Sequence, residues 1–294
     1  RVVNPDAPVT VVIGPGPTGQ GHETTWAQIF GDGLGIPVEN VRVRHGDTQE
    51  HPMGIGTFGS RSLSVDGAAA YEATTRVKEK AAKIAAHILE ASPDDVVLAD
   101  GGAHVAGSPD KSVEWAAIAK AAYQAHTLPE GMDSGLEAQA TFSPGNATWP
   151  FGTHLAVVEV DGDTGDVKIL EYYAVDDCGN IVNPMIVNGQ VHGGITQGIG
   201  QALFEDAIYD ESGNLLTGSL LDYPIPTAAD LPAFALSHTV TPTDVNPMGV
   251  KGIGEAGTIG SAHTIVNAVV DALSPLGVKH IDMPLRPKRV WAAI

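Results

Sequence analysis

The sequence is poor in several residue types, and each shortage excludes a class of protein. One cysteine, Cys178, among 294 residues excludes an internal disulfide and fits a reducing compartment. Lysine and arginine number 16 against 35 acidic residues, and a formal net charge of -19 argues against nucleic acid as a partner. No apolar run approaches the roughly 20 residues of a membrane helix, and no stretch has the pattern of a signal peptide. We therefore expect a cytoplasmic protein without a membrane span.

Several catalytic and metal-binding motifs are also missing. The 11 histidines include no H-E-x-x-H, and the sequence has neither a C-x-x-C pair nor a G-x-S-x-G motif. These absences disfavour a serine hydrolase and a metal held by protein side chains. We therefore expect no metal ligand from the chain, and we expect His22, His45 and His192 to be packing or supporting groups.

The patterns of apolar residues predict a globular α+β protein with two lobes. Strands are expected over residues 7–14 and 233–242, hairpins over 95–107 and 151–177, and helices over 66–91, 112–123 and 261–273. The hairpins argue against an all-parallel sheet, and we expect mixed or antiparallel sheets with flanking helices. Residues 126–150 are irregular and hold three prolines, so we place a lobe boundary there, with lobes over residues 1–130 and 131–294.

The pattern G-x-G-x-x-G occurs twice. The first copy, Gly14 to Gly19, lies between a predicted strand and a predicted helix, as a nicotinamide-binding loop does. Pro15 and Pro17 remove N–H groups that such a loop uses to bind pyrophosphate. An NAD(P)-dependent oxidoreductase therefore stays only as an alternative. The second copy, Gly252 to Gly257, has no strand before it and carries Glu255 at its centre.

Four glycine-rich stretches combine backbone access with polar side chains. They read "GQGHET", "GSRS", "GQVHGGITQGIG" and "KGIGEAG". Because glycine lets a backbone approach a ligand closely, and Arg61 can pair with phosphate, these stretches favour a large polar ligand with phosphates and a heterocycle. Glu255 is a candidate catalytic carboxylate, because it lies among glycines just before a helix. Cys178 is interpreted as a small buried residue.

With these stretches assembled, the sequence strongly resembles the large, molybdenum-binding subunit of the xanthine oxidase family, of the aerobic carbon monoxide dehydrogenase type. The resemblance covers nearly all 294 residues and corresponds to the C-terminal part of that subunit. The matching segments include "TGQGHETTWAQIFGDGLGIP", "GTFGSRSLSVDGAAA", "VDDCGNIVNPMIVNGQVHGGITQGIGQAL" and "GVKGIGEAGTIGSA".

The resemblance implies a molybdopterin cofactor, as the cytosine dinucleotide, and a set of residues around it. The residues expected near the pterin and the molybdenum are Gln20, Gly21, His22 and Thr24. Those expected to hold the dinucleotide are Gly59, Ser60, Arg61 and Ser62, and those expected to line the cofactor are Cys178, Asn183, Gln197, Lys251, Gly252 and Gly254. Glu255 matches the active-site glutamate of the family, which acts as a general base.

The resemblance also implies partners and leaves the substrate open. Electrons would pass to an iron–sulfur subunit and an FAD subunit, in a dimer of heterotrimers that also contains the N-terminal half of the molybdenum subunit. The G-G-G-F-G loop of that half is absent here, as is the copper-binding cysteine loop of true carbon monoxide dehydrogenases. Carbon monoxide, an aldehyde or an N-heterocycle are all open as substrates. The remaining alternative is a non-catalytic fragment that binds no cofactor.

Overall fold

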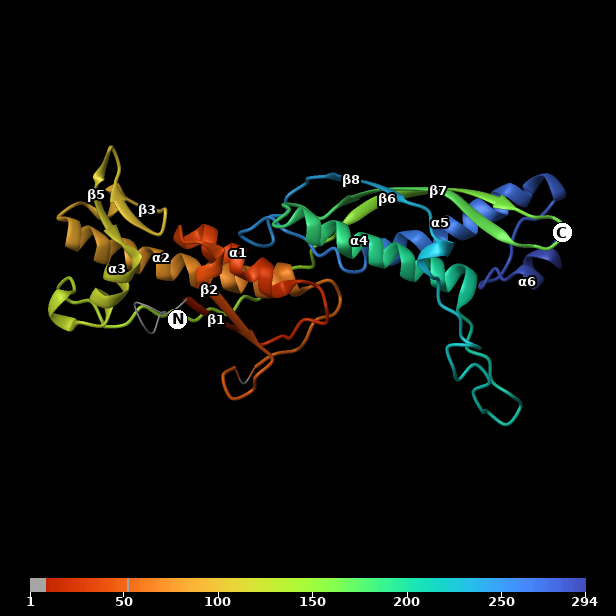
Figure 1. Ribbon diagram of the computed structural model, residues 1–294, viewed down its shortest axis with the longest axis horizontal. Helices are drawn as coiled ribbons and strands as arrows, with labels where there is room; N and C mark the ends of the chain where they lie inside the picture. The colour runs from red at the N-terminus through yellow and green to blue at the C-terminus, as the bar shows by residue number, and fades with distance from the viewer. Residues whose placement is uncertain (1–8, 52) are drawn as a thin grey trace. The chain divides into compact units, whose positions relative to one another are not determined.

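A computed structural model describes residues 9–51 and 53–294 (Figure 1). The chain forms two compact units. The first runs to Thr148 and also includes Thr243–Val250, and the second comprises Trp149–Pro242 and Lys251–Ile294. Both units are α+β, which confirms the predicted fold class. The first unit continues past the predicted boundary at residue 130 because the following segment packs on it: Leu136 is fully buried, and Arg76 donates to the carbonyl of Gln139.

The first unit begins with a parallel β–α–β arrangement. Its elements are β1 (Val9–Ile13), α1 (His22–Leu34) and β2 (Val41–His45). Alternate residues of β1 are buried, as expected for a strand covered on one face. The predicted strand over residues 7–14 is thus found, although residues 7 and 8 lie outside the described part. Helix α1 ends at Gly35, whose φ of 67° is the left-handed conformation that glycine adopts readily.

A long helix and a small antiparallel sheet complete the first unit. A single π-helical turn, Leu63–Gly67, leads into α2 (Ala68–Leu89), which packs against α1. The sheet has the order β3–β4–β5, and α3 follows it. These elements are β3 (Val96–Ala99), β4 (Gly102–Val105), β5 (Ser108–Glu114) and α3 (Trp115–Ala122). In Figure 1 the small sheet lies beside one end of α2.

One predicted element of the first unit is wrong. The sequence predicts a helix beginning after Ser112, but Ser112 lies inside β5, opposite His104 of β4. The helix begins only at Trp115. Pairing with β4 gives Ser112 a place in a strand ladder, and this tertiary contact outweighs the local preference of serine for a helix N-cap.

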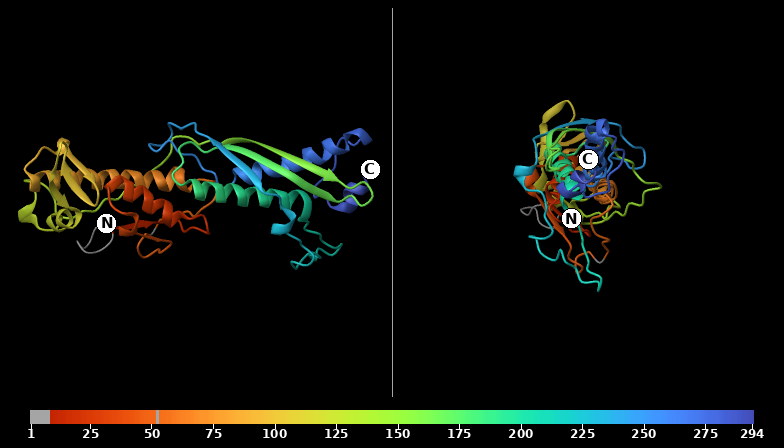
Figure 2. Two further views of the ribbon diagram at one scale, coloured as in Figure 1. Left: turned by 45° about the horizontal axis from the view of Figure 1, so that its top comes forward. Right: turned by 90° about the vertical axis from the view of Figure 1, so that its right-hand side faces the viewer.

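The second unit is a three-stranded sheet with helices on one face. Strand β7 (Val167–Asp177) is central, with β6 (Phe151–Val160) antiparallel and β8 (Phe234–Thr239) parallel to it. Its helices are α4 (Pro184–Ile199), α5 (Ala256–Leu273) and α6 (Pro287–Trp291). The views of Figures 1 and 2 agree that the sheet lies along one side of α4 and α5. Tyr172, Ile195 and Ile265 are fully buried between these layers.

Two glycines let α4 and α5 pack with their backbones in contact. A Cβ at Gly194 would lie 2.9 Å from the Cα of Gly257, and a Cβ at Gly257 would lie 2.8 Å from the backbone nitrogen of Ile195. No larger residue fits at this crossing without moving a helix. Because Gly257 is two residues after Glu255, the crossing fixes the start of α5. Within the described residues, no helix is long and apolar enough to cross a membrane.

Candidate cofactor and catalytic site

The segments that lead into two of the predicted cofactor loops, "GQGHET" and "GSRS", lie against each other in the first unit. The hydroxyl of Thr57 donates to the carbonyl of Gly16 at 3.2 Å, and the hydroxyl of Ser62 donates to that of Thr57 at 3.2 Å. A Cβ at Gly54 would lie 2.7 Å from the carbonyl carbon of Gly14, so these two backbones are in close contact. The first glycine of the G-x-G-x-x-G pattern therefore approaches protein backbone, which is unfavourable for a nicotinamide site there.

The stretch "GQGHET" forms the start of α1. Gly21 is the N-cap with a φ of 71°, and His22 is the first helical residue. The His22 ring lies 5.2 Å from that of Trp26, and its Nδ1 is buried with no hydrogen-bond partner among the described residues. Burial, together with the nearby His45, lowers the pKa of His22, although Glu23 opposes this shift. A neutral imidazole at a helix N-terminus can donate to or accept from a polar ligand.

Two more buried polar groups lie beside the same loops. Oδ2 of Asp66 and Nδ1 of His51 also lack a hydrogen-bond partner within the described part of the chain. Burial raises the pKa of Asp66 to about 6, against the opposing effects of Arg61 and His51. Asp66 lies in the π-helical turn before α2, and such turns are frequent at functional sites. A buried group without a partner is costly, so this cluster is suited to a polar ligand.

The "GSRS" stretch has an unusual backbone. Gly59 and Ser60 both adopt positive φ, 59° and 50° respectively. Positive φ is uncommon for serine, and strained positions of this kind concentrate at binding sites. Arg61 lies over the ring of Phe58, with 5.4 Å from its Cζ to the ring centroid.

In the second unit, Cys178 is joined to the loop that carries Glu255. The backbone N–H of Lys251 donates to the carbonyl of Cys178 at 2.7 Å. Cys178 is buried, and burial together with the charges of Asp177 and Asp176 raises the pKa of its thiol to about 11. The side chain is therefore a neutral thiol at pH 7, in agreement with its interpretation as a small buried residue.

Lys251 is held by its side chain as well. Its Nζ lies 3.0 Å from Oδ1 of Asp177 and 4.6 Å from the centroid of the Phe151 ring. Burial alone would raise the pKa of Asp177, but hydrogen bonds from the Gly179 N–H, from two threonines and from Lys251 lower it to about 2. The Lys251 ammonium is thus paired with a buried carboxylate within the protein.

Glu255 is the N-cap of α5 and is exposed in this chain. Of the glycines before it, Gly252 is buried and Gly254 is exposed. Asn183 is the N-cap of α4, and its Oδ1 accepts the backbone N–H of Ile186 at 3.0 Å. Gln197 is exposed on α4. No three histidine, cysteine or acidic side chains converge on a metal position within the described residues.

The comparisons with known proteins identify the family. The profile of the molybdopterin cofactor-binding domain matches residues 2–232. The chain belongs to this family. It is 46% identical over 276 residues to the carbon monoxide dehydrogenase large chain of Hydrogenophaga pseudoflava, covering 94% of this chain and 34% of that one. It is 42% identical to the nicotine 6-hydroxylase large subunit of Paenarthrobacter nicotinovorans, covering 97% of this chain and 35% of that subunit.

Solved structures agree with the sequence relatives. Quinoline 2-oxidoreductase from Pseudomonas putida 86 matches with a TM-score of 0.93 and 42% identity, over 99% of this chain and 37% of that chain. The carbon monoxide dehydrogenase of Oligotropha carboxidovorans matches with a TM-score of 0.92 and 40% identity, over 99% of this chain and 36% of that chain. The predicted resemblance to the xanthine oxidase family is thus confirmed. The chain spans about a third of the length of these relatives.

The predicted site residues of this molybdopterin cofactor-binding domain fall on both units. The residues from Gln20 to Ser62 belong to the first unit, and those from Cys178 to Glu255 to the second. Within the first unit, Thr57 links Ser62 of the "GSRS" loop to Gly16, in the segment before "GQGHET". Within the second, the structure joins Cys178 to Lys251, whereas the amide oxygen of Asn183 is committed to its helix cap. The cofactor roles of these residues remain proposals.

Sequence reasoning missed Asp66, His51, Thr57 and Asp177. Asp66 looked like an ordinary acidic residue at the start of a helix, and nothing local marks Thr57. Asp177 carried a usable signal: it follows Asp176 at the end of a hairpin strand, directly before a cysteine and a glycine. Two consecutive carboxylates at such a place must lie on opposite faces of the sheet, so at least one of them should be buried.

Proposed function

We propose that this chain is the molybdopterin-binding part of a molybdenum hydroxylase, with Glu255 as its general base. The observation that carries the proposal is that buried atoms of His22, His51 and Asp66, in or near the glycine-rich stretches, lack partners within the described residues, on a chain of the molybdopterin-binding family. These atoms could donate to or accept from a polar heterocycle. The residues present therefore fit the group that the family binds.

We propose the cytosine dinucleotide form of the cofactor. The "GSRS" loop supports this form, because its backbone at Gly59 and Ser60 and the Arg61 guanidinium suit a second nucleotide and its phosphates. Gln20, Gly21, His22 and Thr24, at the start of α1, would hold the pterin end. When bound, the cofactor supplies a two-electron oxidation in which the oxygen comes from water.

Glu255 would accept a proton at its carboxylate. A general base must lie within hydrogen-bond reach of the proton that it takes, and Glu255 is exposed at the N-terminal end of α5. Its neighbours Gly252, Gly254 and Gly257 let the backbone lie close to a ligand on one side and to α4 on the other. The loop and helix that carry Glu255 are thus held by contacts within the protein, and its side chain lies at their surface.

The substrate class is carbon monoxide, an aldehyde or an N-heterocycle. Relatives of similar identity are named for carbon monoxide, nicotine and quinoline, so identity alone does not choose among them. Copper is expected only if the substrate is carbon monoxide. The single cysteine supports a cytoplasmic location.

Exposed apolar surface in the second unit supports the proposal that the chain has protein partners. One face of its sheet packs on helices, while the other carries exposed large apolar side chains on β6 and β7, namely Phe151, Leu155, Val157, Leu170, Tyr173 and Val175. The segment after α4, which extends away from the unit in Figure 1, also exposes Leu220 and Leu221. Contiguous apolar surface of this kind marks interfaces. We propose as partners the N-terminal molybdenum-subunit half, an iron–sulfur subunit and an FAD subunit, in a dimer of heterotrimers.

Metal and cofactor analysis of the protein purified from its native host, with whatever co-purifies, tests the proposal. We expect about one molybdenum and one pterin per chain, with iron and flavin from attached partners. Copper in addition would point to carbon monoxide as the substrate. A folded chain that carries no molybdenum and no pterin, even with its partners attached, would establish the non-catalytic alternative.

A further inference from the structure

Strand β7 ends in two consecutive buried aspartates, Asp176 and Asp177. Asp176 is 2% exposed and Asp177 is 0% exposed. Buried carboxylates are rare and costly unless they are paired. Because successive side chains of a strand point to opposite faces, the two carboxylates act on different neighbours. Neither of them belongs to the cofactor-binding residues proposed above.

Asp177 binds the loop that precedes Glu255. Lys251, four residues before Glu255, donates from Nζ to Oδ1 of Asp177, and the hydroxyl of Thr239 donates to Oδ2 at 2.9 Å. The N–H of Gly179 also donates to Oδ1, at 3.0 Å. Together with the backbone bond from Lys251 to Cys178, these contacts fix the first residue of the loop at both its main chain and its side chain.

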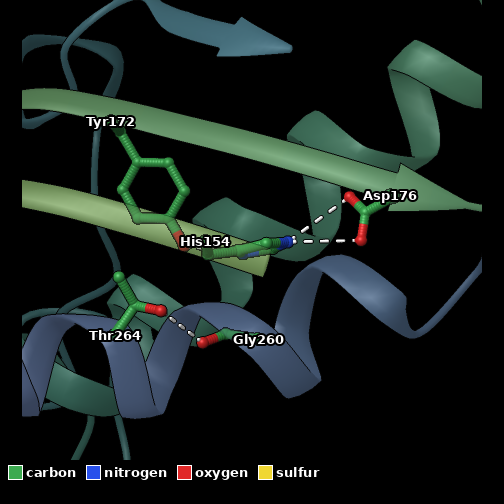
Figure 3. A network of polar contacts seen from close by, with 5 residues as sticks. All are labelled: His154, Tyr172, Asp176, Gly260 and Thr264. Carbon is green, nitrogen blue, oxygen red and sulfur yellow. Dashed lines mark hydrogen bonds and ion pairs between the residues drawn. The ribbon is translucent and has the colours of Figure 1, made fainter. Parts of the chain in front are cut away.

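Asp176 acts on the opposite face, through His154 of β6. Nε2 of His154 lies 3.3 Å from both carboxylate oxygens of Asp176, and Nδ1 lies 2.9 Å from the hydroxyl of Tyr172 (Figure 3). A carboxylate can only accept, so Nε2 donates to it, and in the neutral ring Nδ1 then accepts from Tyr172. Both ring nitrogens are thus satisfied, and the orientation of the ring is fixed.

The fixed His154 ring in turn locates the first turns of α5. A Cβ at Gly260 would lie 2.7 Å from Nδ1 and Cε1 of His154, so the ring rests directly on the helix backbone there. Figure 3 shows the ring between Asp176 and the helix segment that contains Gly260 and Thr264. Gly260 is five residues after Glu255. Gly152 makes the matching space for Asp176, because a Cβ there would overlap its carboxylate.

We propose that Asp176 and Asp177 are positioning residues for Glu255: Asp177 holds the loop before it through Lys251, and Asp176 holds the helix after it through His154. The end of β7 is thus a common anchor for the chain segments before and after Glu255. The inference rests on the proposed role of Glu255 as base. It explains why the loop before the exposed Glu255 contains a buried lysine, and why a histidine and two aspartates are buried nearby.

The experiment compares variants of the holoenzyme purified with its partners. Lys251→Met and His154→Gln each remove one arm, and the double variant Asp177→Asn/Lys251→Met removes a charge pair without leaving either charge alone. Lys279→Met and Asp271→Asn, at exposed positions of the same unit, are the controls. Turnover of carbon monoxide, benzaldehyde and quinoline is measured with dye reduction, along with molybdenum content and hydrogen exchange of residues 251–262.

We expect kcat to fall roughly 100-fold in the arm variants, with KM within about threefold and molybdenum retained, because a small misplacement of a catalytic group has an effect of this size. Exchange of the backbone amides of residues 251–262 should rise about tenfold or more, with the controls unchanged. If the loaded variants keep kcat within about threefold, or if exchange is unaltered, the anchor is refuted. If Lys251→Met fails to fold, the charge-neutral double variant tests the same arm, and His154→Gln tests the other.

Failure of the proposed function would give a different result from failure of the anchor. A wild-type protein that carries no molybdenum would overturn the proposed function, yet the hydrogen-exchange comparison would still decide whether Asp176 and Asp177 order the loop. A molybdenum-loaded wild type whose arm variants keep full turnover would overturn only the anchor.

Discussion

In the first unit, buried polar atoms beside the glycine loops lack partners among the described residues, whereas in the second unit the buried charges at the end of β7 are paired. His22, His51 and Asp66 each have a buried side-chain atom with no hydrogen bond in the described part of the chain, while Asp177 holds Lys251 and Asp176 holds His154. The pKa values of the two carboxyl groups differ in the same sense: that of Asp66 is raised to about 6 and that of Asp177 is lowered to about 2.

This difference concerns how each unit would respond to a bound ligand. An unsatisfied polar cluster costs stability in the free chain and gains it when a ligand supplies the missing hydrogen bonds. A satisfied cluster holds its neighbours in place without a ligand. Under the proposed function, the first unit would bind the polar cofactor and the second would hold Glu255 in place.

The largest expected effect concerns that support. Glu255→Gln should lower kcat by about 10²–10⁴-fold, because it removes the proton acceptor, and should leave the molybdenum content unchanged. Glu211→Gln, at an exposed turn of the same unit, is the matched control. Steady-state kinetics and metal analysis on the same preparations give the result. Full turnover in a molybdenum-loaded Glu255→Gln enzyme would remove Glu255 from the mechanism.

Asp66→Asn tests whether the first unit carries an unsatisfied charge. A folded-state pKa raised to about 6 means that Asp66 favours the folded state below the unfolded pKa and that this contribution is lost as the pH rises through 6. At pH 7 and without cofactor, the variant should be more stable than the wild type by roughly 3 kcal/mol, and near pH 4 the difference should vanish. Urea unfolding across this range measures it. A variant that is less stable at pH 7 would mean that the charge has a partner.

The second unit should show the opposite dependence. The pKa of Asp177 is lowered to about 2, so its contribution is present above the unfolded pKa and is lost as the pH falls from about 4 towards 2. The wild type should lose roughly 2 kcal/mol over this window relative to the Asp177→Asn/Lys251→Met variant. Parallel acid titrations of unfolding stability give the comparison. Identical acid dependence of the two proteins would show that the ion pair adds nothing.

The smallest effects separate packing from helix propensity within α4. Gly194→Ala should destabilise by at least about 1 kcal/mol, because its Cβ would meet the backbone of Gly257. Gly193→Ala, one residue earlier and facing open space, should instead stabilise by about 0.5–1 kcal/mol. Thermal unfolding of the two variants checks the change of sign. Equal effects would mean that α4 and α5 are not in backbone contact at this point.

The periodic elements could be predicted from the sequence, and the contacts between distant segments could not. The hairpin over residues 151–177 and the helix ending at Leu273 follow from alternation and helical spacing. Ser112 was misassigned, because its local preference for a helix cap was overridden by pairing with β4. In the first unit, glycine content and donor residues predict which loops bind the cofactor, and that role stays a prediction.

The buried partners of the site needed the fold. Nothing in the spacing joins Asp177 to Lys251, which are far apart in the sequence, or places His154 against Gly260. A buried ion pair forms where two surfaces of the protein pack together. These surfaces belong to strands and helices that are distant in the sequence. Asp66 is similar, since its raised pKa depends on burial that the helix pattern does not specify.

Molybdenum per chain in two variants, Arg61→Met and Glu255→Gln, tests the division between the units most directly. Both proteins would be purified from the native host with their partners and measured beside the wild type. The account predicts that Arg61→Met loses most of its molybdenum, because a proposed cofactor contact of the first unit is removed, while Glu255→Gln keeps the wild-type amount. Full molybdenum in Arg61→Met together with a loss in Glu255→Gln would contradict it.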